Sequence, residues 1–438
     1  MAVAAERQAL DLSKGLYETG FYHSFELPDS SLIKGCIDLE FLRKRWAWFG
    51  LPDDLRGARV LDIGAWDGWF SFEAARRGAD VTAIDCVEIP NFLAMRERLG
   101  VKVDYRVLDF YEIPQAKLGK FDFVLFLGVL YHLKHPLLAL EIVCEHATEM
   151  AIVDSFVIDG DTWRESVGQI PMMEFYETDE LGTHFDNWIG PSVTSLEAMC
   201  RAAGFARVEM ARAAGNNAVF RCWRRPLPAP TGATAPPPKL RAAIHARNTG
   251  INFTTGKEEY ISCWFESARE TIGRNDLIID VSGYGVPTLY TRSDHPGVWT
   301  ANFRVPLGLA PGWHDVKLRF PESQYSNAVR IAMDIPPQPV GLSLVAVCGA
   351  HGWTDFRMTP VDNGFLCVYV KGLSENCDRN NLRVMLGGKR IAVDFIAAPD
   401  ENGVRQINVA AGSPAPGPYQ VHVEFGGVVS NSLPLQVE

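Results

Sequence analysis

The sequence lacks any run of 18 uninterrupted apolar residues, and its first residues lack an apolar stretch of signal-peptide length. We therefore expect no membrane-spanning segment and a cytoplasmic location. The nine cysteines include no C-x-x-C pair and no cysteine and histidine spacing typical of zinc. Most of them lie in apolar segments such as EYISCWF and GFLCVYV, which predicts small buried side chains with no disulfide and no metal.

Positive charge is scarce in the first half of the chain. Residues 1–225 carry a net charge of −10, whereas residues 226–438 carry −1. No stripe of lysine and arginine occurs in the first half, so a polyanion would approach it against an unfavourable field. Composition therefore argues against a nucleic-acid partner.

Prolines mark a boundary near the middle of the chain. The segment RRPLPAPTGATAPPPK, residues 224–239, contains six prolines and no aromatic residue. Segments of this kind are extended, semi-rigid spacers with nothing to pack. We predict an N-terminal helical lid over residues 1–54, an α/β domain over 55–225, a linker over 226–239, and two β-sandwich modules over 240–337 and 338–438.

The part before the linker alternates strand-like apolar runs with helix-like segments, as in ARVLDIG, WFSFEAARRG and ADVTAID. Continuous apolar strands in such an alternation are typical of a parallel sheet that helices cover on both faces. We therefore predict a Rossmann-like α/β domain with a mostly parallel sheet.

The part after the linker has short alternating strands between Gly, Pro, Asn and Asp, which predicts an all-β structure. The pattern repeats after 104 or 105 residues, and the pairs are Cys263 with Cys367, Asn275 with Asn380, and Asn327 with Asn431. Two modules of this size resemble immunoglobulin-like β-sandwiches. We expect the asparagines to bond their own backbone, and the modules to hold a glycan or a protein or to form a dimer.

The stretch LDIGAWDG ends one predicted strand and begins a helix. Gly64 allows a tight turn, Gly68 allows the helix to approach the sheet, and Ala65 and Trp66 lie in the loop between them. The spacing is D-x-G-x-x-x-G, not the G-x-G-x-x-G of nicotinamide sites, and the carboxylate of Asp62 suits a ligand ammonium group. S-adenosylmethionine carries such a group.

Two further carboxylates end the next two predicted strands. Asp85, followed by Cys86, is placed to accept hydrogen bonds from ribose hydroxyls. Asp109 lies where an adenine amino group would lie, and Phe110 is placed to cover the base. The alternative is that each aspartate simply begins a turn, but the ordered set favours a cofactor.

These residues resemble the class I S-adenosylmethionine-dependent methyltransferases over residues 55–225. The segments FDFVLFLGVLYHLKHPLLAL and VIDGD resemble the tRNA wobble-uridine carboxymethyltransferase-like family. Gly128 and Tyr131 are expected to belong to the cofactor pocket, and the resemblance implies that Asn187 and Trp188 line the acceptor side. The family's arginine for a carboxylated cofactor is replaced by Asn217, so ordinary S-adenosyl-L-methionine is expected, with Arg221 as a conceivable shifted partner.

Methyl transfer to a hydroxyl requires removal of a proton, which favours a histidine or a carboxylate near the acceptor. The candidate bases are His132, His184, His23, His135 and Asp154. His23 and Tyr176 are also candidate acceptor contacts, and the aromatic segment GLYETGFYHSFELPDSSLIKG is interpreted either as a sealed flap or as a lid that excludes water.

Three functions are open at this point. The first is O-methylation of a small molecule or a sugar, which the aromatic, acidic first domain favours. The second is tRNA modification, which rests on the resemblance alone. The third is a non-catalytic scaffold that binds S-adenosylmethionine and acts through its β modules.

Overall fold

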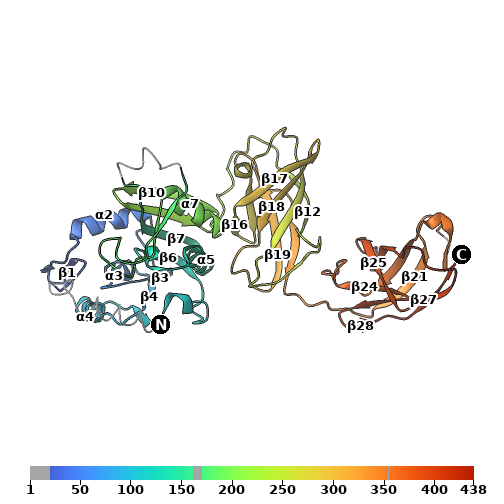
Figure 1. Cartoon of the computed structure of the whole chain (residues 1–438), viewed down its shortest axis with the longest axis horizontal. Helices are drawn as coiled ribbons and strands as arrows, with labels where there is room; N and C mark the ends of the chain where they lie inside the picture. The colour runs from blue at the N-terminus through green and yellow to red at the C-terminus, as the bar shows by residue number, and fades with distance from the viewer. Residues whose placement is uncertain (1–19, 161–169, 354) are drawn as a thin grey trace.

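The computed structural model describes residues 20–160, 170–353 and 355–438, which form three units in a row (Figure 1). The first unit contains a seven-stranded sheet. Its strands are, in spatial order, β10 (Arg207–Ala214), β11 (Asn217–Trp223), β7 (Ala147–Phe156), β6 (Phe121–Leu127), β3 (Arg59–Ile63), β4 (Asp80–Asp85) and β5 (Asp104–Val107). The strands from β7 to β5 pair in parallel, whereas β11 and β10 are antiparallel. The predicted mostly parallel α/β sheet is confirmed.

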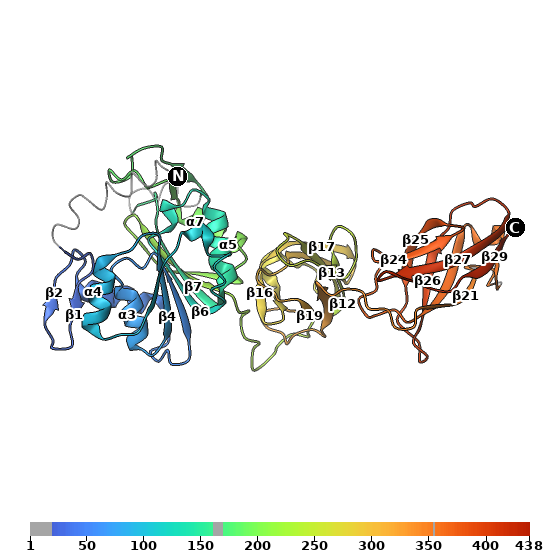
Figure 2. The same cartoon turned by 90° about the horizontal axis from the view of Figure 1, so that it is seen from below.

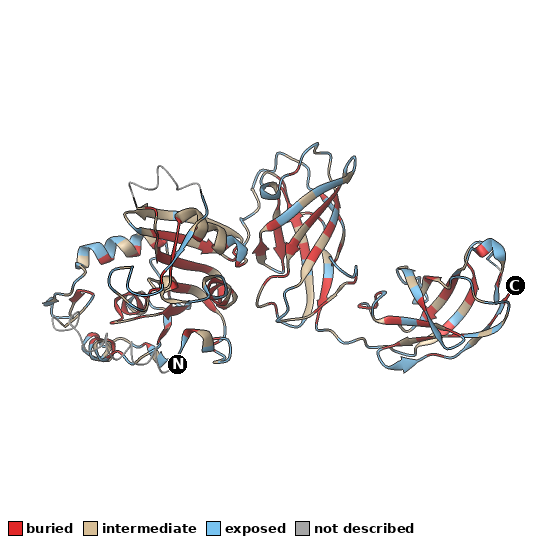
Figure 3. Cartoon of the chain, viewed as in Figure 1, coloured by how far each residue is buried: buried red, intermediate tan, exposed pale blue. Residues whose placement is uncertain are grey.

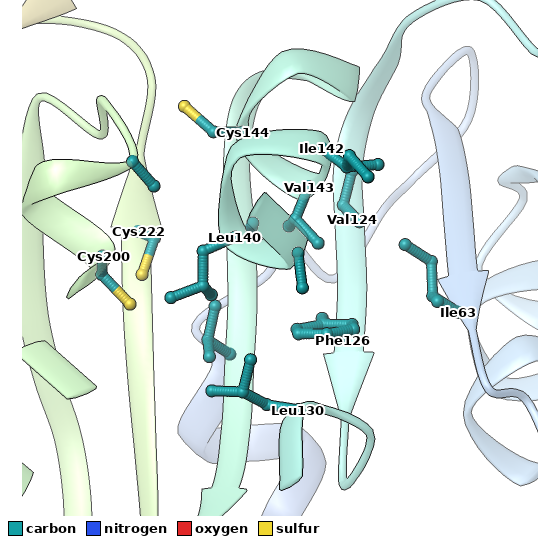
Figure 4. Packing of buried hydrophobic residues seen from close by; sticks show 14 of the residues in the cluster. Ile63, Val124, Phe126, Leu130, Leu140, Ile142, Val143, Cys144, Cys200 and Cys222 are labelled. Atoms are coloured by element: carbon teal, nitrogen blue, oxygen red, sulfur yellow. The ribbon is translucent and has the colours of Figure 1, made fainter. Parts of the chain in front are cut away.

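Helices cover both faces of this sheet (Figure 2). The helices are α2 (Leu39–Phe49), α3 (Trp69–Arg76), α4 (Pro90–Leu99), α5 (Pro136–His146) and α7 (Val193–Ala202), with 3-10 turns η1 (Phe110–Glu112) and η2 (Leu130–His132). Helices α2, α3 and α4 bury apolar side chains in one cluster, and α5 and α7 in another. The second cluster includes Leu140, Phe126 and the cysteines Cys144, Cys200 and Cys222, all labelled in Figure 4. These two clusters form the core of the domain, and the candidate site described below lies at the carboxyl ends of the parallel strands.

The N-terminal segment differs from the predicted helical lid. Its described part begins at residue 20 and forms a short hairpin of β1 (Phe25–Glu26) and β2 (Leu32–Ile33) before α2. The sequence PDSS favours a turn between the strands, and Ser30 there has a φ of 66°. Only α2 of the predicted lid is helical, and residues 1–19 lie outside the described residues.

The two β modules follow as the second and third units (Figure 1). In module 1, one sheet has the order β12 (Lys239–His245), β14 (Tyr260–Glu266), β18 (Val298–Arg304) and β17 (Thr288–His295). The other has the order β13 (Asn252–Phe253), β20 (Val329–Met333), β19 (Gly312–Arg319), β15 (Ile278–Val281) and β16 (Tyr284–Val286). Buried residues alternate with more exposed ones along the strands (Figure 3), and buried apolar side chains of the two sheets form one cluster.

Module 2 has the corresponding strand order, with one difference. Its strands are, in spatial order, β21 (Ser343–Gly349), β23 (Phe365–Lys371), β26 (Val404–Ala410), β25 (Lys389–Ile396), β24 (Leu382–Leu386), β27 (Gly417–Phe425), β29 (Leu433–Val437) and β22 (Arg357–Met358). Strand β28 (Val428–Val429) pairs with β27. The difference is that β25 pairs with both β24 and β26 and so joins the parts that are two separate sheets in module 1. The predicted all-β half is confirmed.

The tandem repeat appears most clearly before the last strand of each module. Asn327 exchanges hydrogen bonds with the main chain of Leu240, and Asn431 does so with Leu344, in both cases 87 residues away. These amides therefore hold the first strand of each module, and the expectation that they bond their own backbone is wrong.

One predicted pair of the repeat is shifted by one residue. Cys263 points into the core of module 1, whereas Cys367 points outward and lies 3.4 Å from Asn408 Oδ1. The inward residue at the matching position is Val368. Successive side chains of a strand point to opposite faces, so a one-residue error reverses the assignment.

The proline-rich segment is not a free spacer. The Arg319 guanidinium donates to the carbonyls of Leu227 and Pro228 at 2.7 and 2.8 Å, and the side chain of Gln324 donates to Pro230. The segment therefore lies against module 1, which supplies the donors that the prolines themselves lack.

Arg224, just before the proline-rich segment, is fully buried at the junction of the first two units. Its guanidinium donates to the carbonyls of Leu307 and Ala147 and lies over the Tyr284 ring.

Among the described helices, none is both long and apolar enough to cross a bilayer.

Candidate functional site

The loop after β3 depends on its glycines. Gly64 and Gly68 have φ values of 71° and 91°, which side chains rarely adopt. A Cβ at Gly64 would lie 2.4 Å from a methyl group of Val129, and one at Gly68 would lie 2.5 Å from the Phe72 ring. Glycine at both positions lets the loop, which contains the buried Ala65, approach the turn after β6 and the start of α3.

Asp85 ends β4 beside this loop and is 7% exposed. Its Oδ2 accepts from the Trp66 main-chain N–H at 3.0 Å, and its Oδ1 accepts from that of Cys86 at 2.8 Å. Each carboxylate oxygen has a second lone pair, so both remain able to accept from a ligand diol. Burial raises the pKa of Asp85, and the two N–H donors oppose that rise. The geometry fits the ribose contact that the sequence predicts.

Asp62 lies below the loop, inside the domain. It is 2% exposed and accepts a hydrogen bond of 2.6 Å from the Ser71 hydroxyl of α3. Burial raises the pKa of Asp62 to about 7, and the nearby Asp85 adds to that rise. A ligand ammonium group bound beside this carboxyl would stabilise its ionised form, because the two charges are opposite.

The third predicted carboxylate has a different environment. Asp109 is exposed and caps η1 by accepting from the Tyr111 main-chain N–H at 2.8 Å. Phe110 is 7% exposed, and its ring centroid lies 5.5 Å from that of Phe126. The turn-capping alternative therefore describes Asp109 in this structure, and the Phe110 ring packs in the core instead of presenting an open face.

An ion pair that the sequence analysis missed lies at the end of β7. Arg45 of α2 donates to Asp154 Oδ2 at 2.6 Å, and Asn217 donates to Asp154 Oδ1 at 2.7 Å. The Arg45 and Asp154 side chains are 15% and 3% exposed. Arg221 instead binds the Trp48 carbonyl, so it is not a shifted partner for a ligand carboxylate. Because Arg45 and Asp154 lie 109 residues apart, no spacing rule would have joined them.

A second missed pair joins the N-terminal segment to the glycine loop. Asp67 accepts from the main-chain N–H groups of Tyr22 and His23, and it also contacts the His23 ring. His23 and Asp67 are 5% and 1% exposed, so the segment is bonded over the loop. This position over the glycine loop is the one expected under both interpretations of the segment, a sealed flap and a lid.

Tyrosines complete the cluster around Arg45 and Asp154. Burial raises the pKa of Tyr131 of η2, and the neighbouring Tyr22 and Asp154 add to that rise. Gly128, with a φ of 72°, begins the turn that carries Tyr131, and its N–H donates to the Asp154 carbonyl. The structure thus brings both predicted pocket residues to the end of β6.

His132 follows Tyr131 and faces Asp186. Its Nδ1 lies 3.3 Å from both the carbonyl oxygen and Oδ2 of Asp186, and its side chain is 36% exposed. His184 lies in the same loop and is half-buried. His135 is exposed at the start of α5, and its ring lies against Tyr111.

The remaining predicted acceptor contacts surround a short hairpin of β8 (Met173–Phe175) and β9 (Ile189–Pro191). Asn187 is 4% exposed, and its Oδ1 has no hydrogen-bond partner among the described residues. The Trp188 ring lies under Lys134 at 4.1 Å. The Tyr176 hydroxyl bonds Glu174 at 2.9 Å, and its ring is 7% exposed. Tyr176 is therefore turned into the protein, whereas Asn187 offers an unused acceptor.

Comparisons with known proteins agree with this geometry. Residues 40–210 match the family described as Methyltransferase domain. A tRNA U34 carboxymethyltransferase of Azotobacter vinelandii is 34% identical over 184 residues, which is 39% of this chain and 53% of that protein. A protein of the same description from Pseudomonas aeruginosa is 32% identical over 182 residues, 39% of this chain and 52% of that protein.

The chain spans about half the length of these curated relatives. Among solved structures, the N-terminal domain of EvdMO1 with SAH bound matches 50% of this chain and 96% of that domain, with 19% identity and a TM-score of 0.36. The predicted methyltransferase, an enzyme, is confirmed for the part of the chain that these sequence matches cover, residues 40–210.

Proposed function

We propose that the chain transfers a methyl group from S-adenosyl-L-methionine to a hydroxyl of a small neutral molecule or a sugar unit. The observation that carries this proposal is the pairing of charges at the strand ends. Arg45 is paired with Asp154, so its positive charge is already compensated, and Asp67 is held by the main-chain N–H groups of Tyr22 and His23. A neutral acceptor fits such a site better than a phosphate backbone does.

The chain's own residues would hold the cofactor at three places. Asp85, which accepts from the Trp66 N–H, would also accept from the ribose hydroxyls, and Asp62, bonded by Ser71, would ionise beside the ammonium group. The glycine turn between them brings the main chain close to the ligand. Bound there, the cofactor supplies a methyl group on a positively charged sulfur.

His132 is the proposed base. Asp186 lies 3.3 Å from its Nδ1 through both its carbonyl oxygen and Oδ2, which would hold the ring in one orientation beside the acceptor side. Asp154, the alternative base, is less suited because it is 3% exposed and binds Arg45 and Asn217, and taking up a proton would remove the negative charge that pairs with Arg45. The segment around Tyr22 and His23 would keep water from the acceptor side.

Modification of tRNA is the second candidate, and the named relatives favour it. Against it are the charge of −10 in residues 1–225 and Asn217, whose amide is bonded to Asp154 and offers no positive charge. Binding of tRNA that weakens steeply with salt would support this candidate. An absence of tRNA binding at low salt would remove it.

The test is methyl transfer from isotope-labelled S-adenosylmethionine to a panel of neutral sugars, phenols and tRNA. We expect a sugar or another neutral hydroxyl compound to be labelled. His132→Asn should lower kcat by about 100-fold or more with little change in KM, as expected for loss of a general base. His422→Asn, in module 2, should have no effect.

Labelling of tRNA alone would contradict the proposal. Cofactor binding without transfer to any acceptor would favour the non-catalytic scaffold.

A further inference from the structure

A depression of about 510 Å³ lies in module 1, away from the strand ends of the methyltransferase domain. It lies on the outward face of the sheet of β12, β14, β18 and β17, opposite the face that packs into the core of the sandwich. Side chains alternate along these strands, so Trp299, Ala301 and Phe303 point inward and Thr300 and Asn302 point into the depression.

Two aromatic rings flank this depression. Trp264 on β14 and Tyr290 on β17 are each 48% exposed, although large aromatic side chains usually lie in cores. The strand register places Trp264 opposite Thr300 and Tyr290 opposite Asn302, on either side of the central strand β18. The two rings therefore border a shared polar floor.

The floor contains an acceptor without a partner. Asn302 Oδ1 is buried and has no hydrogen-bond partner among the described residues. Ser262 lies opposite Asn302 on β14 and also lines the depression. A buried amide oxygen without a donor is unfavourable, and a ligand hydroxyl would supply that donor.

The charges at the edge of the depression compensate one another. Arg292 donates to Asp294 Oδ1 at 2.8 Å, and the Thr300 hydroxyl bonds the other oxygen of Asp294. An ionic ligand would have to compete with this pair. A neutral ligand with several hydroxyl groups could bind without breaking this ion pair.

Module 2 supplies an internal comparison. Its outward residue Asn408 occupies the position of Asn302, since Ile407 and Ala301 are the matching inward residues. There, however, Gln406 donates to Asn408 Oδ1 at 3.0 Å, with Cys367 nearby. The amide oxygen at this strand position therefore has a hydrogen-bond donor in module 2, whereas in module 1 it has none among the described residues.

From these observations we propose that the outward face of β14, β18 and β17 in module 1 binds a neutral sugar unit of a glycan. One face of the sugar ring stacks on Trp264, and its hydroxyls bond Asn302 and Ser262. A peptide is a poorer fit, because peptides that add to sheets do so at strand edges, and this depression lies on a face.

The outward face of β14, β18 and β17 in module 1 continues to the junction with the methyltransferase domain. Arg304, the next outward residue of β18 after Asn302, forms an ion pair with Glu141 of α5. A glycan held on module 1 would therefore lie on the side of the module that meets the enzyme domain. The binding itself does not depend on methyl transfer, so the two proposals fail separately.

The test uses the full chain and four neutral disaccharides, maltose, cellobiose, lactose and chitobiose, followed by calorimetry and by saturation-transfer NMR. We expect saturable binding of at least one disaccharide. Trp264→Ala and Asn302→Ala should each weaken it by about tenfold or more, and Trp264→Phe should weaken it less. The matched changes in module 2, Tyr369→Ala and Asn408→Ala, should alter it by less than about twofold.

Unchanged melting temperatures of the Trp264 and Asn302 variants would show that they fold. Three results would overturn the proposal. The first is no saturable binding of any of the four disaccharides. The second is equal binding by the wild type and Trp264→Ala. The third is a loss of disaccharide binding in the module 2 variants, Tyr369→Ala and Asn408→Ala, instead of in the module 1 variants.

Discussion

In each β module, a Ser-Asn pair before the last strand bonds the main chain of other strands, whereas near the end of β7 in the methyltransferase domain three polar side chains bond one another. Ser326 and Ser430 accept from main-chain N–H groups of β19 and β27. Arg45, Asp154 and Asn217 form a side-chain network with side chains from three elements. The first arrangement stabilises a fold, and the second leaves a site whose stability depends on every member being present.

The largest expected effect is at the buried ion pair of the methyltransferase domain. Arg45→Met leaves Asp154 buried without its cation, which should lower the free energy of unfolding by about 3–5 kcal/mol. Arg43→Met, two residues away on the same helix, removes an exposed pair with Glu26 and should cost about 1 kcal/mol or less. Denaturant unfolding measures both, and equal losses would contradict the account.

Asp62 gives the next effect and a defined pH dependence. Its pKa in the fold is about 7, against an ordinary 3.8. As pH rises from 3.8 to 7, the unfolded chain loses this proton while the fold keeps it, so stability falls over that window. Asp62→Asn removes the penalty, and its gain in unfolding free energy should be about 2–3 kcal/mol larger at pH 8 than at pH 5.

Thermal or denaturant unfolding of the wild type and Asp62→Asn at both pH values tests this prediction. Asp80→Asn, at the exposed start of β4, is the control. A gain for Asp62→Asn that does not change with pH would be inconsistent with a buried carboxyl of raised pKa.

The smallest effect sharpens the comparison between the modules. Asn327→Ala and Asn431→Ala each remove two hydrogen bonds to the first strand of their module, from partners 87 residues away. Each should lower the free energy of unfolding of its own module by about 1–2 kcal/mol. Hydrogen exchange resolves the two modules, and clearly unequal losses would show that the repeat is not equivalent in energy.

Much of the architecture could be predicted from the sequence because apolar runs determine which segments are buried. The runs that end in Asp62 and Asp85 predict two neighbouring strands, and the structure pairs them as β3 and β4. The tandem repeat was likewise visible in Asn327 and Asn431. These features depend on local pattern, which a sequence carries directly.

The remainder depends on partners that are distant in sequence. Neither the bond from Arg45 to Asp154 nor the contact of His23 with Asp67 follows from any local spacing. The proline-rich segment was predicted to be free because its own composition offers nothing to pack, yet Arg319 of module 1 binds its carbonyls. The one-residue error at Cys263 arose because two alternating strands can be aligned in either register.

The most direct test of the central claim is calorimetry of S-adenosylhomocysteine binding to the full chain. The account predicts one site per chain, at least tenfold weaker binding by Asp85→Ala, and unchanged binding by Asp80→Ala at the other end of the same strand. Equal affinity in the wild type and Asp85→Ala, or no binding to the wild type, would contradict the assignment of the cofactor site to the carboxyl ends of β3 and β4.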